Sequence, residues 1–144
     1  MLSQLDTQTV TFLCISPELR PYLCVSNARA AIDWYVQVLG AEVTYQPIMM
    51  DDGRVGHVEL AIGDAHWMMA DAFPEVGVEP PLTDRGAAVS LHLTVDDVDA
   101  WAERVVAAGV PMDRGPQDEE YAGRIAIFHD PYGHRWYLNS MPDS

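Results

Sequence analysis

The 144-residue sequence has no lysine, two cysteines and no long apolar run, and each shortage excludes a class of protein. Without lysine, the chain cannot form a Schiff base with a carbonyl substrate or use a lysine general base. Cys14 and Cys24 are too few for the disulfide framework of a small secreted domain or for a zinc finger. The apolar stretches are short against the roughly 20 residues that span a bilayer. We therefore expect a cytoplasmic domain with neither a membrane span nor a secretory signal.

Positive charge is also scarce, because 8 basic residues face 22 acidic ones and the formal net charge is -14. A surface of this sign repels nucleic acid and anionic membranes, which excludes both as partners. It favours cationic ligands, although an acidic surface also serves solubility alone. The hydrophobic share of 49% and the chain length indicate one folded domain.

Residues 21–40 follow a plan of strand, polar cap, helix and glycine stop. Residues 22–25 form a short apolar strand, and Ser26 or Asn27 offers a side chain that caps a helix. Gly40 is placed to end that helix in the left-handed conformation. Apolar residues then recur at helical spacing on one face, at Ala28, Ile32, Tyr35 and Leu39.

The same plan returns at residues 89–109, which indicates an internal repeat. Residues 91–95 are the strand, Asp96 or Asp97 the cap, and Gly109 the stop. The helix face is again apolar, at Val98, Trp101, Ala102 and Val105.

The two later segments match as well, with strand character over 53–62 and 66–70 in one and over 123–129 and 135–138 in the other. Laid side by side without a gap, Gly53, Arg54 and Gly63 fall on Gly123, Arg124 and Gly133. Each copy therefore reads β-α-β-β-β, and the fold class is α+β.

These patterns divide the chain into module one (20–72), a linker rich in proline, glycine and acid (73–87), and module two (88–140). Residues 1–19 form an N-terminal extension with no counterpart in module two. Within it, residues 9–12 alternate as in an extra strand, or belong to a tail that packs on a partner chain.

Several segments together resemble one protein family: 21–23, 31–35, 39–42 and the aspartate-proline turn at 130–136. They look like the corresponding segments of the vicinal-oxygen-chelate superfamily, which includes glyoxalases, bleomycin-resistance proteins and extradiol dioxygenases. Residues 56–60 and 68–74 are similar to the branch named for phosphonate-utilisation operons. The resemblance implies two βαβββ modules forming a cup-shaped mixed sheet around a small-molecule ligand, and a homodimer.

Metal-using members of this superfamily place a metal ligand on the first and last strand of each module. Carried over by spacing, these positions fall on Arg20, on Met68 or Met69, on Ser90 and on Tyr137. None is a histidine or a carboxylate, the ligands that a divalent metal needs here. We therefore expect no metal cofactor.

The same resemblance suggests which residues line the cup. Tyr22 and Tyr137, with Trp67 or Met69, would form aromatic and apolar walls, unless Trp67 faces the helices instead. Two arginines complete the predicted ligand-binding set. Arg20 either binds an anionic ligand or pairs with an acid, and Arg124 follows an acidic stretch that borders the cup.

His92 is the candidate catalytic residue, because it shares a strand face with Ser90 and Thr94 and would point into the cup. It is either a general base, a hydrogen-bond donor to the ligand, or a packed histidine. His57 and Glu59 share a face of their own strand, so a displaced metal site with His92 is an alternative to the metal-free prediction.

Three functions follow from these features. The first is a small-molecule-binding protein without the usual metal site, which sequesters an aromatic or cationic compound. The second is a lyase or isomerase that uses a displaced divalent metal or His92 as general base. The third is an interaction module with a vestigial cup. The sequence leaves open whether the chain is an enzyme.

Overall fold

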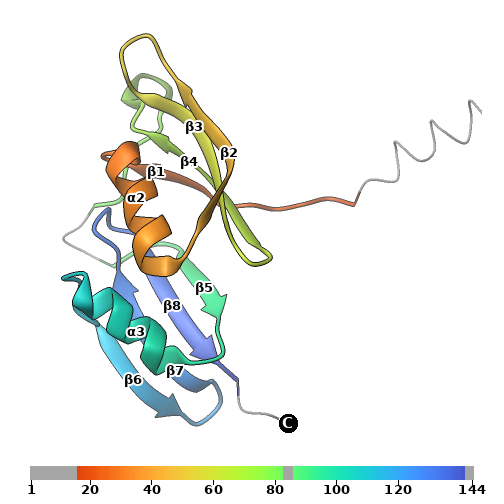
Figure 1. The fold of residues 1–144 in the computed structure, drawn as a ribbon, viewed down its shortest axis with the longest axis vertical. Helices are drawn as coiled ribbons and strands as arrows, with labels where there is room; N and C mark the ends of the chain where they lie inside the picture. The colour runs from red at the N-terminus through yellow and green to blue at the C-terminus, as the bar shows by residue number, and fades with distance from the viewer. Residues whose placement is uncertain (1–15, 83–85, 142–144) are drawn as a thin grey trace, which may run out of the picture.

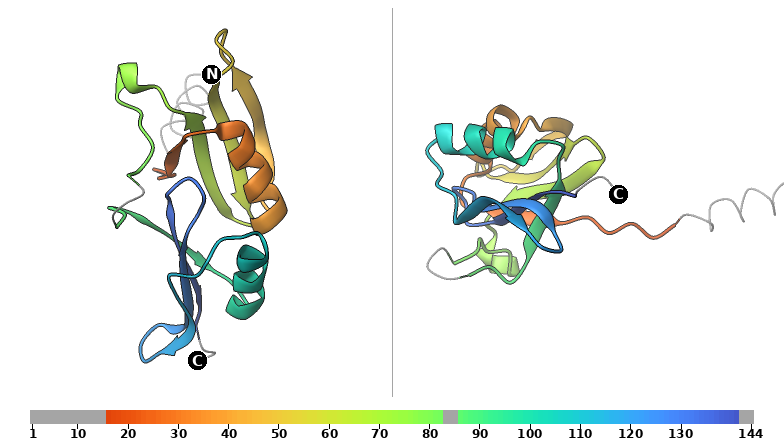
Figure 2. Two further views of the ribbon diagram at one scale, coloured as in Figure 1. Left: turned by 90° about the vertical axis from the view of Figure 1, so that its left-hand side faces the viewer. Right: turned by 90° about the horizontal axis from the view of Figure 1, so that it is seen from below.

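A computed structural model describes residues 16–82 and 86–141, and these fold into two modules that lie one above the other (Figure 1). Both α-helices lie on one side of the sheets when the molecule is seen from below (Figure 2). Module one contains β1 (Tyr22–Val25), α2 (Ala28–Leu39), β2 (Glu42–Met49), β3 (Val55–Ile62) and β4 (Ala65–Asp71). Module two contains β5 (Ser90–Thr94), α3 (Val98–Ala107), β6 (Arg114–Glu119), β7 (Gly123–His129) and β8 (Arg135–Ser140).

Each module has its own four-stranded mixed sheet, with the orders β1-β4-β3-β2 and β5-β8-β7-β6. The first strand pairs in parallel with the last in both modules, and the other pairs are antiparallel. The predicted α+β class and the repeated βαβββ plan are confirmed. The strands form two sheets, however, because no described strand of one module is hydrogen-bonded to a strand of the other.

The helices begin and end where their sequence signals predict. The Asn27 side chain accepts a hydrogen bond from the backbone N–H of Ala30 at 3.1 Å, and Gly40 ends α2 with a φ of 70°. Asp97 caps α3 in the same way, at 3.1 Å from the backbone N–H of Ala100. Side-chain oxygens thus satisfy backbone donors that have no partner inside the helix.

The core lies between the helices and the facing side of each sheet. Strand alternation directs every second residue there, which places Trp67 and Met69 in the core with 4% and 0% of their surface exposed. The prediction that Trp67 or Met69 lines the cup is therefore wrong. Trp67 instead packs edge-on against Tyr35 and Trp136, with ring centroids 5.5 and 5.7 Å apart.

The turn between β7 and β8 joins the two modules. The Asp130 carboxylate accepts hydrogen bonds from the Tyr35 hydroxyl of α2 at 2.5 Å and from the Trp136 indole at 2.9 Å. His134 bonds through Nε2 to the backbone carbonyl of Cys24 in β1 at 2.8 Å. His134 is thus part-buried and bridges the modules.

The opposite side of each sheet, called the open face below, points away from the helices. Met49 and Met50 are exposed at the end of β2 and in the following turn. A 3-10 helix (Pro74–Val76) and the bridge between Phe73 and Val78 follow β4 in the linker. Residues 9–12, interpreted from the sequence as an extra strand or a tail that packs on a partner chain, lie outside the described residues. No described helix is long and apolar enough to cross a membrane.

Candidate functional site

A row of hydrogen-bonded side chains crosses the open face of module one. The Tyr22 hydroxyl of β1 lies 2.9 Å from Nδ1 of His57 in β3 and 3.2 Å from the backbone carbonyl oxygen of Gly56. The other ring nitrogen of His57, Nε2, lies 3.0 Å from Oε2 of Glu59. Strand alternation explains the row, because residues 57 and 59 share a face of β3.

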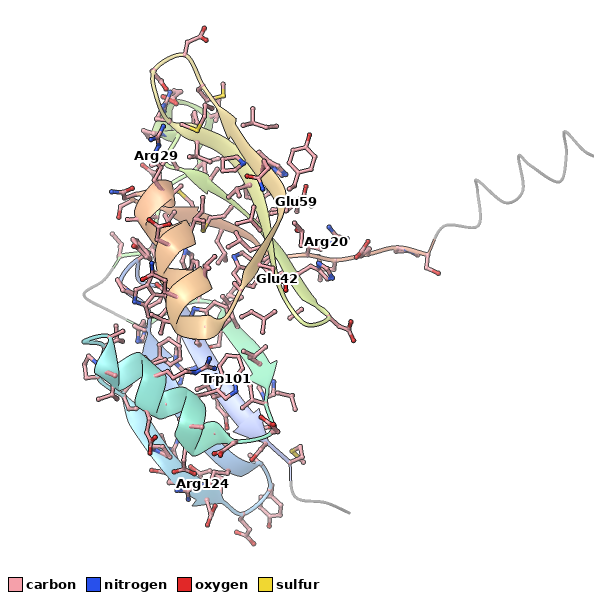
Figure 3. The ribbon with its side chains drawn as sticks, in the orientation of Figure 1. Arg20, Arg29, Glu42, Glu59, Trp101 and Arg124 are labelled. Atoms are coloured by element: carbon pink, nitrogen blue, oxygen red, sulfur yellow. The ribbon has the colours of Figure 1, made fainter. Side chains whose placement is uncertain are left out.

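Arg20 closes the row at the other end, just before β1 begins. Its Nη1 lies 3.2 Å from Oε1 of Glu59, and its Nε donates to Glu18 at 2.9 Å. Figure 3 shows Arg20 and Glu59 on the same side of module one. The guanidinium therefore has two carboxylate partners, which favours the ion-pair alternative over the binding of an anionic ligand.

Tyr45 of β2 adds a second aromatic wall that the sequence analysis did not identify. The His57 ring lies between two tyrosines, with centroids 5.5 Å from Tyr22 and 5.8 Å from Tyr45. The two tyrosines are 48% and 51% exposed, although both are held against the same histidine. Exposed rings held in fixed positions beside polar groups are typical of a small-molecule surface.

The surroundings keep the Tyr22 phenol in its protonated form. Partial burial raises the pKa of Tyr22 above its usual value, and the negative charge of Glu59 raises it further. At neutral pH this residue therefore carries a neutral hydroxyl and not a phenolate.

Two hollows adjoin Tyr22. One, of about 250 Å³, is mainly apolar and is lined by Tyr22, Met50, Gly56, Ala70, Phe73, Val76 and Val78. The other, of about 620 Å³, lies between β1, the linker and the β7–β8 turn. Cys24 lines this second hollow, and burial, Asp71 and Glu79 raise the pKa of its thiol, which keeps it uncharged.

The open face of module two carries the other predicted ligand residues. His92 and Tyr137 are neighbours across β5 and β8 and stack with ring centroids 5.1 Å apart. Arg135 donates to the Ser90 hydroxyl at 2.6 Å. His92 is exposed and also lines a hollow of about 490 Å³ against the β3–β4 turn. It lies in a different module from His57 and Glu59.

Arg124 lies away from this face, which corrects its place in the predicted ligand set. Its guanidinium forms two hydrogen bonds to Asp99 of α3, at 2.8 and 2.9 Å, and another to Asp118 at 3.2 Å. Arg124 therefore points to the helix side of β7, near the far end of module two (Figure 3). Arg124 shares this face of β7 with the core residues Ala126 and Phe128, but Ile125 and Ile127 are apolar and buried as well, so the sequence pattern of this strand does not indicate the face.

The residues at the four family metal positions do not fit a divalent metal. Arg20 carries a positive charge already paired with carboxylates, and Met68, Ser90 and Tyr137 offer a thioether, a hydroxyl and a stacked phenol. Among the described residues, no three histidine, cysteine or acidic side chains are grouped to hold a metal ion. The displaced site of His57, Glu59 and His92 is therefore not assembled within one chain.

Known proteins resemble this chain over most of its length. An uncharacterized protein of Mycobacterium tuberculosis, Rv0887c, is 33% identical over 136 residues, which cover 92% of this chain and 78% of that protein. A putative glyoxylase of Mycobacterium bovis, CFP32, is 33% identical over 78 residues, which cover 53% of this chain and 30% of that protein.

Solved structures agree with the fold. The protein PA1353 from Pseudomonas aeruginosa has a TM-score of 0.66 at 26% identity, covering 89% of this chain and all of that one. TnmS3, an antibiotic binding protein from Streptomyces sp. CB03234, has a TM-score of 0.65 at 28% identity, covering 90% and 98%. The model of the Glyoxalase/Bleomycin resistance protein/Dioxygenase superfamily matches residues 15–138. Because this model matches most of the chain, and because the repeated βαβββ modules and these relatives agree with it, the chain belongs to that superfamily.

Proposed function

We propose that this protein binds a small organic molecule on the open face of module one, without the metal that other members of its superfamily use. The observation that carries the proposal is the fixed, exposed cluster of Tyr22, His57 and Tyr45, backed by the Glu59–Arg20 ion pair. Aromatic side chains with a few placed polar groups are the usual lining of a small-molecule site. The likeness to an antibiotic binding protein supports this class of function.

Charge and ring chemistry favour aromatic or cationic compounds as ligands. The formal net charge of -14 steers cations toward the protein, and the two tyrosine rings offer π-faces to a flat or positively charged molecule. Sequestration of such a compound requires only binding, and no bond of the ligand needs to break.

A titration with acridine orange, a flat cationic dye, tests this proposal. Dye fluorescence should saturate at one site per chain, and 8-anilinonaphthalene-1-sulfonate, which is anionic, should bind more weakly. We expect Tyr45→Ala and His57→Ala each to weaken dye binding about tenfold or more, because each removes a stacking or contact surface. Tyr121→Ala is the matched control, since Tyr121 is 88% exposed and lies in the β6–β7 turn. Equal effects of all three substitutions would refute the site.

Metal independence is tested separately by elemental analysis. The protein is soaked with zinc, manganese or iron(II), desalted and analysed, and we expect no stoichiometric retention because the donor groups do not suit these ions. Retention of one ion per chain would refute the metal-free proposal.

We also propose a homodimer in which a second copy covers the exposed end of β2. The apolar side chains of Ile48 and Met49 there are exposed in a single chain and would be buried by such a contact. Light scattering should then give twice the 16.0 kDa of one chain. The cytoplasmic location and the branch named for phosphonate-utilisation operons stay predictions from the sequence.

A second candidate function is acid–base catalysis by a lyase or isomerase. The specific observation in its favour is that a carboxylate, an imidazole and a phenol lie in one hydrogen-bonded series, at 3.0 and 2.9 Å. On the other module, His92 is the predicted base. Turnover of a bound compound that is lost in His57→Ala or His92→Ala would favour this function. Absence of both binding and turnover would favour the interaction module with a vestigial cup.

A further inference from the structure

The Tyr22 hydroxyl lies beside an apolar hollow that has room for a ring system. The hollow measures about 250 Å³, and none of its described lining residues has a charged side chain. A cavity of about 150 Å³ is large enough to take benzene, so this one admits a flat molecule of one or two rings. Among its described lining residues, Tyr22 alone has a polar side chain, and the backbone carbonyl oxygen of Gly56 lies 3.2 Å from the Tyr22 hydroxyl.

The polar row behind Tyr22 has a defined hydrogen-bond direction. Arginine only donates and an ionised carboxylate only accepts, so Glu59 accepts from Arg20 on one oxygen and from His57 on the other. The proton of the neutral His57 ring is therefore on Nε2. A neutral imidazole has one N–H, which leaves Nδ1 as an acceptor.

Nδ1 of His57 must then receive its hydrogen bond from Tyr22. The phenol has one proton, and its oxygen is closer to Nδ1, at 2.9 Å, than to the Gly56 carbonyl oxygen, at 3.2 Å. With that proton committed to the row, the phenol oxygen offers only lone pairs to a molecule in the hollow. The Gly56 carbonyl is also an acceptor, so both polar groups beside the hollow accept hydrogen bonds.

We infer that this hollow selects a flat aromatic compound that donates a hydrogen bond, of the phenol class, over the same compound with its donor blocked. The inference rests on the proposed binding function and adds the chemical class of ligand. The compound with its donor blocked binds more weakly, because it displaces water from the acceptors of Tyr22 and Gly56 and gives them no hydrogen bond in return.

The test compares 2-naphthol with 2-methoxynaphthalene, which has the same rings but no donor, by equilibrium dialysis at about pH 8, where histidines are generally neutral. We expect the wild-type protein to bind 2-naphthol roughly tenfold more tightly, the effect of one net hydrogen bond. This wild-type ratio tests the inference without any variant. Equal affinities, or no binding of either compound, would overturn it.

Glu59→Gln provides the sharper test, because it should reverse the direction of the hydrogen bonds between residue 59, His57 and Tyr22. Arg20 attracts the amide oxygen, so the amide N–H₂ turns toward His57 and the ring proton moves to Nδ1. Tyr22 then accepts from His57, and its own proton becomes available to a ligand. We expect the preference for 2-naphthol to disappear and 2-acetylnaphthalene, which only accepts, to bind several-fold more tightly than it does to wild type.

The matched control is Glu42→Gln, which removes the same charge from an exposed position of β2 (Figure 3) and should leave the wild-type ratio intact. A folded Glu59→Gln variant that keeps the wild-type preference would overturn the inference. If acridine orange binds through Tyr45 and His57 but the naphthalene compounds show no preference, only the inference fails. If neither the dye nor the naphthalenes bind, the proposed function fails with it.

Discussion

Replacing Tyr35 by phenylalanine tests how the two modules are held together. The Tyr35 hydroxyl donates to the Asp130 carboxylate at 2.5 Å, and the two residues are 0% and 4% exposed. One comes from α2 of module one and the other from the β7–β8 turn of module two. The substitution removes one oxygen atom and keeps the ring, so packing against Trp67 and Trp136 is preserved.

The expected loss follows from the partners that remain. A hydrogen bond to a charged group contributes about 1.5–3 kcal/mol, more than one between neutral groups. In Tyr35→Phe, Asp130 still accepts from the Trp136 indole and from the backbone N–H groups of Tyr132 and His134, at 2.9, 2.9 and 3.0 Å. The carboxylate is therefore not orphaned, and we expect a loss near the lower end, about 2 kcal/mol in the free energy of unfolding.

Urea denaturation followed by tryptophan fluorescence measures this loss, with Tyr121→Phe as control. Tyr121 is 88% exposed, so removal of its hydroxyl should change the free energy of unfolding by less than about 0.5 kcal/mol. If Tyr35→Phe also changes it by less than this amount, the hydroxyl–carboxylate bond adds no net stability. The proposed link between the modules would then be refuted.

Three further predictions concern stability. Burial and the charge of Asp130 raise the pKa of Tyr35, so the folded state keeps a proton that the unfolded state releases above about pH 10. The contribution of Tyr35 to the free energy of unfolding is complete below that pH and is lost as pH rises through the raised pKa. Urea titrations at a series of alkaline pH values should therefore show that this free energy falls less steeply with pH in Tyr35→Phe than in the wild type. Trp67→Ala should cost about 3–5 kcal/mol because it empties a core position, whereas His92→Ala, at an exposed position, should cost less than about 0.5 kcal/mol in the same assay. Arg124→Gln should shift the urea midpoint slightly, through loss of its Asp99 and Asp118 contacts, and leave acridine orange binding unchanged.

Local signals predicted the helices and most strands closely. Asn27 and Gly40 bound α2 because a side-chain acceptor and a left-handed glycine act on the backbone within a few residues. The repeated plan likewise predicted which strands belong to each module. The sequence did not predict where the second strand of each module, β2 or β6, begins and ends. Both strands are irregular, because the pairings of β2 with β3 and of β6 with β7 contain register shifts and β2 includes a proline.

Strand register decided the placements that sequence reasoning left open or predicted wrongly. A shift of one residue moves a side chain to the other face, so Trp67 and Met69 lie in the core while Met68, opposite Tyr22, lies on the other face. Arg124 lies on the helix side for the same reason, because Asp99 of α3 is its partner.

By itself, the sequence determined the class of fold, the two modules and the helix ends. These depend on residue type and on spacing within a short stretch of chain. Only the tertiary structure decided that Tyr22, His57 and Glu59 form one row and that Asp130 joins Tyr35, because strand pairing and module packing bring together residues far apart in sequence. The direction of hydrogen bonds in that row, and with it the class of ligand we infer, depends on those long-range contacts.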